Sequence, residues 1–72
     1  MKWYEVWSDV SPGYPYILIL SAKEDGRFVV SDPKEGNKVV YSSNEYEEAK
    51  LWLLEDEFTL VSGRMTELEH NL

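Results

Sequence analysis

Hydrophobic residues recur with two different periods along this chain, and these periods separate one helix from several strands. In the second half of the chain the period is helical. Tyr46, Ala49 and Leu53 fall on one stripe when each residue advances by about 100°. Trp52 flanks this stripe, which we expect to pack against a sheet. Leu51 falls on the far side and is expected to point away from that sheet.

Capping residues mark the start of the helix. Ser42 and Glu45 have the spacing of a capping box, in which the serine hydroxyl accepts from the backbone N–H of the glutamate. They predict a helix that begins at Ser42. Asn44 with Glu47 offers a second start a little further along the chain.

The helix is expected to run almost directly into a strand. Residues 55–57 are all acidic and end the helical pattern, and residues 58–62 alternate as a strand does until Gly63. An acidic run at a helix C-terminus opposes the helix dipole, so this turn carries an electrostatic cost.

Four stretches in the first part of the chain have the composition of strands. The turn between the second and the third contains Asp25-Gly26, which predicts a two-residue type I′ hairpin. Alternation does not decide which face of the first stretch is buried, because both of its faces carry aromatic residues. The four stretches are Trp3–Trp7, Tyr16–Leu20, Arg27–Ser31 and Lys38–Tyr41.

The second of these strands predicts a sheet with both faces covered. Residues 16–20 are apolar without interruption, which is typical of a strand buried on both sides. A single helix covers only one face of a small sheet. The other face must therefore meet Trp3 and Trp7, a second subunit or a ligand.

The element order is thus β-β-β-β-α-β. It predicts a two-layer α+β domain in which an antiparallel sheet of four to five strands packs against one helix. The last strand joins the first or another strand of the sheet. We assign residues 1–64 to this single domain and residues 65–72 to a frayed tail or weak helix.

The charge of the chain is strongly negative and uneven. It has 14 acidic and 7 basic residues among 72, a net charge of −7, and residues 43–57 hold much of the acidic excess. Binding to nucleic acid or to an anionic membrane needs a basic patch, so both are unexpected. Two interpretations stand: the charge attracts a basic protein, or it only keeps a small domain in solution.

No constellation of residues predicts catalysis or a cofactor. Cysteine is absent, and the single histidine, His70, stands alone in the tail, so neither a nucleophile with a base nor a metal set can be assembled. No glycine-rich phosphate loop is present. We therefore expect no enzyme activity, no cofactor and no metal. The three tryptophans either belong to the core or line a platform for a ligand. Arg64 either pairs with an acidic residue of the chain or binds an anion.

The outward side of the helix is the one surface that we single out for interaction. Leu51 lies there with Leu54 near its edge, which is either ordinary surface exposure or a contact for another chain. The surface consists of Leu51, Leu54, Glu47, Glu48 and Glu55.

Part of the chain resembles small uncharacterised cyanobacterial proteins. The similarity spans residues 27–65 and lies in residues 52–58, Val61-x-Gly63-Arg64, Asp32-Pro33 and Val39-Val40-Tyr41-x-Ser43. The resemblance implies a bacterial cytosolic setting and no known activity. The chain also opens without the pattern of a signal peptide, which favours a cytoplasmic location.

Taken together, the sequence favours a non-catalytic protein-interaction module. Self-association as a homodimer, through the uncovered sheet face or Leu51, is one way to cover its apolar surfaces, and the competing account is that Trp3 and Trp7 fold over the sheet face while Leu51 is simply exposed. The alternative is an acidic inhibitor or nucleic-acid mimic that occupies a basic site on another protein. A small-ligand binder that uses the tryptophans is the third hypothesis.

Overall fold

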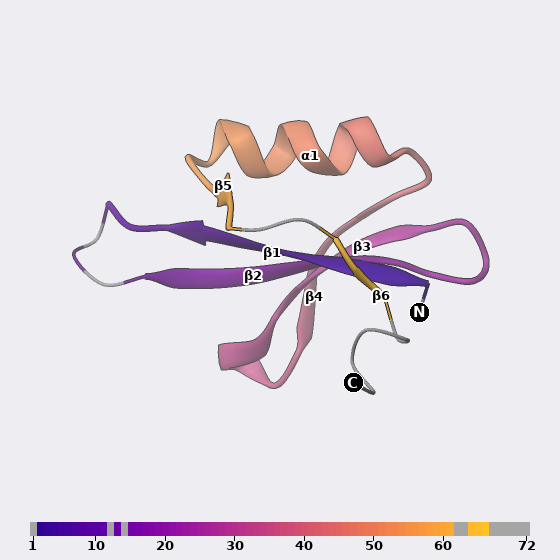
Figure 1. Cartoon of the computed structure of the whole chain (residues 1–72), viewed down its shortest axis with the longest axis horizontal. Coiled ribbons are helices and arrows are strands. Elements are labelled where there is room, and N and C mark those ends of the chain that lie inside the picture. The colour runs from indigo at the N-terminus through magenta and orange to yellow at the C-terminus, as the bar shows by residue number, and fades with distance from the viewer. Residues whose placement is uncertain (1, 12, 14, 62–63, 67–72) are drawn as a thin grey trace.

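The computed structural model describes residues 2–11, 13, 15–61 and 64–66, and it has one helix packed on one antiparallel sheet (Figure 1). This is the predicted two-layer α+β fold, and the predicted order of its first five strands and helix is confirmed. The elements are β1 (Trp3–Asp9), β2 (Tyr16–Ala22), β3 (Phe28–Asp32), the 3₁₀ turn η1 (Pro33–Glu35), β4 (Lys38–Ser43), α1 (Tyr46–Glu55), β5 (Thr59–Leu60) and β6 (Met65–Thr66).

The first strand lies inside the sheet. The strand order is β4-β3-β2-β1-β5, and β6 also pairs with β1. Strands β1 to β4 form an antiparallel meander, and the segment after the helix returns to the free edge of β1. The last strand thus pairs with the first, one of the arrangements that the sequence allowed.

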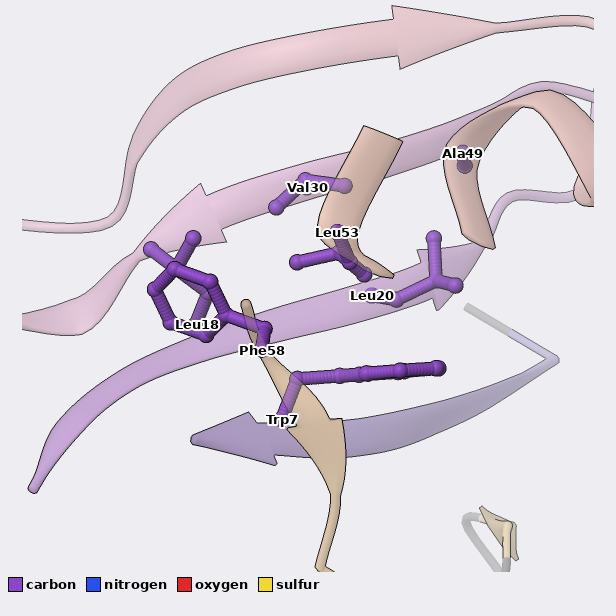
Figure 2. Packing of buried hydrophobic residues seen from close by; sticks show 7 residues of the cluster. All are labelled: Trp7, Leu18, Leu20, Val30, Ala49, Leu53 and Phe58. Atoms are coloured by element: carbon purple, nitrogen blue, oxygen red, sulfur yellow. The ribbon is translucent and has the colours of Figure 1, made fainter. Parts of the chain in front are cut away.

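The core lies between α1 and one face of the sheet (Figure 2). Ala49 and Leu53 on the helix are fully buried, while Tyr46 and Trp52 pack against the cluster from its margin. The predicted helix stripe is therefore confirmed. The buried cluster consists of Trp7, Leu18, Leu20, Val30, Ala49, Leu53 and Phe58.

The helix begins later than the sequence predicts. Strand β4 continues to Ser43, which pairs with Phe28, so Ser42 lies in the sheet and is not a helix cap. The N-cap is Glu45, whose side chain makes no capping hydrogen bond. Instead the Ser43 hydroxyl accepts from the Glu45 backbone N–H at 3.0 Å. We attribute the late helix start to strand pairing, which satisfies backbone groups of β4 that an earlier helix start would leave without partners.

The helix ends in a Schellman motif. The Phe58 N–H donates to the Leu53 carbonyl at 2.9 Å and the Glu57 N–H donates to the Leu54 carbonyl at 3.1 Å. The motif requires a left-handed residue, and here it is Glu57 at φ 66° in place of the usual glycine. Leu53 and Phe58 meet in the core, which provides the apolar contact that accompanies this motif.

The hairpin between β2 and β3 differs from the predicted two-residue turn. The Gly26 N–H donates to the Lys23 carbonyl at 3.1 Å, and the Lys23 N–H donates to the Arg27 carbonyl at 2.8 Å. Glu24 and Asp25 are therefore the central residues of the turn, and only Gly26 has positive φ, at 90°. A type I′ turn needs positive φ at two residues, so the observed loop takes three residues and places its left-handed position at glycine.

The segment after the helix pairs with β1 in two short pieces. Trp7 pairs with Leu60, and Tyr4 pairs with Met65, so this segment has two more residues than the β1 stretch opposite it. The pairing of Met65–Thr66 continues the sheet past the predicted domain end at residue 64. Residues 67–72, the rest of the predicted tail, lie outside the described residues.

Candidate interaction surfaces

The face of the sheet that α1 does not cover carries two rows of side chains. We call this the open face; among the described residues, no helix packs on it (Figure 1). Trp3 and Trp7 lie on the helix side, where Trp7 is buried beside Leu53, so the tryptophans do not close the open face. The two rows are Val6–Ile19–Ser31–Val39 and Tyr4–Ser21–Val29–Ser42.

A hollow of about 500 Å³ lies on the open face. Val29 forms a buried part of its floor, whereas Val39 is 55 % exposed at its side. Tyr4 and Ile19 are half-buried. The hollow therefore presents apolar groups to solvent along with the half-buried Ser31, while Ser21 is buried in its lining.

Two cationic side chains are among those that line this hollow. Lys23 and Arg27 line it, and no carboxylate does. Arg27 also pairs with Asp25 on the hairpin loop, at 2.9 Å between Nε and Oδ2, with both side chains more than half exposed. Asp25 offsets the charge of Arg27, so in a chain of net charge −7 the hollow keeps Lys23 as a further cation and has no carboxylate in its lining.

The predicted interaction surface on the helix is exposed. We call it the outer helix surface, and it consists of Leu51, Leu54, Glu47, Glu48 and Glu55. Leu51 is 55 % exposed and Leu54 is 45 % exposed, whereas Leu53 between them is fully buried. Glu48 accepts a hydrogen bond from the Ser43 hydroxyl. This surface lies on the opposite side of the molecule from the open face.

A buried carboxylate lies at the edge of the core. Glu5 is 3 % exposed, and its oxygens accept from the Trp7 indole N–H at 3.1 Å and the Tyr46 hydroxyl at 2.9 Å. Arg64 donates to the same carboxylate at 3.1 Å and places its guanidinium 4.0 Å from the centre of the Trp3 ring. The alternation of apolar and polar residues in the sequence did not indicate this site, because the site joins residues that are 59 apart in the sequence.

The Glu5 site fixes the charge states of Tyr46 and Arg64. Burial raises the pKa of Tyr46 above its ordinary value of 10.0, and hydrogen bonding to Glu5 raises the pKa of Arg64 above its ordinary value. Tyr46 is thus a neutral donor and Arg64 a permanent cation near neutral pH. The sequence left Arg64 as the partner of an acid or of an anion, and the structure supports the first. The contacts of Arg64, Tyr46 and Trp7 satisfy the buried Glu5 carboxylate, so their role at this site is structural.

A second hollow, of about 290 Å³, lies near the end of α1. Trp52 is the one tryptophan that lines it, since Trp7 is in the core and Trp3 packs on Tyr46. The three tryptophans therefore do not form a common platform. The lining residues are Tyr16, Leu18, Val40, Trp52 and Phe58 with Asp9, Asp32 and Asp56.

The described part of the chain shows no group of three or more histidine, cysteine or acidic residues that could hold a metal ion. His70 lies outside it. No helix among the described residues is long and apolar enough to cross a membrane.

The fold and its surfaces define a two-layer α+β domain with one apolar sheet face left uncovered in its described part. Comparisons with protein-family models, curated proteins and solved structures give no match to this chain.

Proposed function

We propose that this protein is a non-catalytic protein-interaction module and that it binds through the open face. One observation carries the proposal: apolar side chains from four adjacent strands line the open face, and none of the described helices packs on it. Val39 there is exposed, and Val6 and Ile19 are half-buried. Burial of apolar surface contributes about 25 cal/mol per Å², so covering this face would stabilise a complex.

The breadth of the open face favours a protein over a small molecule as its partner. Its rows extend from β1 to β4, and three serines are spread among the apolar side chains along them. A small-molecule site usually has a few polar groups that converge on one point. A protein surface matches polar and apolar groups spread over several strands better.

Site-specific photo-cross-linking tests this proposal. A photoreactive phenylalanine analogue at Val39 would lie on the open face, and the same analogue at Val10, which is 68 % exposed, serves as the matched control. We expect protein adducts from position 39 and few from position 10, with adducts lost when Ile19→Glu is added to place a negative charge on the face. Equal adducts from both positions would contradict the proposal.

The acidic outer helix surface favours a second candidate, an inhibitor that occupies a basic site on another protein. Glu47, Glu48 and Glu55 are all exposed there. Binding of this kind weakens steeply with added salt and depends on the helix rather than on the open face. Adducts that depend on Glu47 and Glu55, and not on Ile19, would favour this candidate.

A further inference from the structure

We infer that the partner of the open face is the outer helix surface of a second copy of this chain. The inference rests on the proposed function and names its partner. It joins two surfaces of the described residues that carry exposed apolar side chains, the open face with cations in its hollow and the outer helix surface with glutamates.

Charge complementarity is the first argument. The hollow of the open face is lined by Lys23 and by Arg27, which is paired with the exposed Asp25, and no carboxylate lines it. The outer helix surface has glutamates on both sides of its leucines. Two open faces brought together would place cations against cations, and two outer helix surfaces would place acids against acids. Only the mixed contact pairs opposite charges, which favours association and suppresses the other two arrangements.

The packing of the chain on itself is the second argument. On the covered face, α1 inserts Ala49 and Leu53 against the strands. On its other side the same helix presents Leu51 and Leu54, about one turn apart. An apolar pair on a helix is suited to an apolar sheet face, so a second copy would repeat the existing helix-on-sheet layer.

The contact would be heterologous, because the two surfaces lie on opposite sides of one molecule. Each copy would offer its helix to one neighbour and its open face to another. Blocking one surface on one copy and the other surface on a second copy leaves one good interface between them. Two variants that are each monomeric alone should therefore form a complex when mixed, a result that other modes of self-association do not give.

The experiment uses two full-length variants, each blocked at one surface. Leu51→Lys places a cation on the outer helix surface, and Ile19→Glu places an anion on the open face, opposite the glutamates of the helix. Sedimentation velocity is measured for each variant alone and for an equimolar mixture, from micromolar to millimolar concentration. Circular dichroism shows whether each variant folds, and Val39→Glu replaces Ile19→Glu if that variant does not.

We expect wild type to self-associate, each variant alone to be monomeric, and the mixture to form a one-to-one complex. The complex should weaken on the order of tenfold or more when salt is raised from low to physiological ionic strength, because opposite charges are screened.

Three results would overturn the inference. If Leu51→Lys self-associates like wild type while Ile19→Glu does not, the open face binds another open face, and the proposed function survives while its partner changes. If only Ile19→Glu self-associates, the helix is the contact and both proposals fail. If wild type stays monomeric throughout, a second copy is not the partner, and the cross-linking at Val39 decides the proposed function independently.

Discussion

Arg64 donates to Glu5 across the sheet edge, with 3.1 Å between Nε and Oε2, and it thereby joins the segment after the helix to the first strand. A second arginine makes almost the same contact elsewhere: Arg27 Nε lies 2.9 Å from Asp25 Oδ2. The acceptors differ in exposure, since the Glu5 side chain is 3 % exposed and the Asp25 side chain 57 % exposed. The shorter distance would suggest that the Arg27–Asp25 pair contributes more to stability. We expect the opposite, because a buried carboxylate loses more free energy than an exposed one when a donor is removed.

The first prediction compares these two arginines. Arg64→Ala leaves the Glu5 carboxylate buried with two neutral donors, and we expect it to lower the free energy of unfolding by about 2 kcal/mol. The value is below the full cost of breaking a buried pair because Arg64 itself is 49 % exposed. Arg27→Ala should change the free energy of unfolding by less than about 1 kcal/mol, because both partners of that pair are exposed. Urea denaturation measures both, and equal effects would contradict the structural role of the Glu5 site.

The second prediction compares neighbouring leucines. Leu53→Ala removes a fully buried side chain from between helix and sheet and should cost roughly 2–5 kcal/mol of stability. Leu54→Ala, on the exposed side, should cost less than about 0.5 kcal/mol. The midpoints of chemical denaturation give both values. A midpoint that Leu53→Ala leaves unchanged would show that the helix packs by another face.

The third prediction concerns the left-handed residue that ends the helix. Glu57 has φ 66°, which costs a residue with a Cβ atom about 1 kcal/mol, so Glu57→Gly should stabilise the protein by roughly 0.5–1 kcal/mol. Glu57→Gln separates strain from charge, because it keeps the strained backbone and removes only a carboxylate near the helix C-terminus. Thermal unfolding should rank glycine above glutamine, and the reverse order would assign the effect to charge.

The fourth prediction concerns acid stability. The Ser11 hydroxyl, 2.6 Å from Asp9 Oδ1, and the Ser11 backbone N–H hold the pKa of Asp9 below its ordinary value of 3.8. The stabilisation is therefore complete above that value and is lost as pH falls through the lower pKa of the folded state. Ser11→Ala removes the stronger of the two hydrogen bonds and should raise the pKa of Asp9. NMR titration of the carboxyl carbons measures it, with Asp25 as the internal control. An unmoved Asp9 would mean that the hydroxyl contributes nothing.

The spacing of apolar residues along the chain predicted which faces of the helix and of the second strand are buried. The spacing of Ala49 and Leu53 gave the buried face of the helix, and it also placed Leu51 outside. The uninterrupted apolar residues 16–20 indicated a strand with a second face to cover, and that face is the open face. These features follow from side-chain period alone, so no knowledge of distant partners was needed.

Features that depend on distant partners were missed. Ser42 has a good capping context, yet pairing with Val29 holds it in β4. The position of Glu5 in the core became clear only with Arg64 and Tyr46 beside it. Trp3 and Trp7 were ambiguous because both faces of their strand are aromatic, and packing on the helix decided between them. In each case contacts that are remote in sequence outweigh a local preference.

The position of β1 between β2 and the segment that follows the helix has a consequence for synthesis on the ribosome. The meander and α1 can assemble as soon as residue 55 has emerged, but β1 keeps one unpaired edge until Thr66 has emerged as well. During that interval the Glu5 carboxylate lacks its cation, and an edge of backbone donors and acceptors is open to other chains. Nascent chains on neighbouring ribosomes are therefore most prone to mispairing just before the sheet is completed.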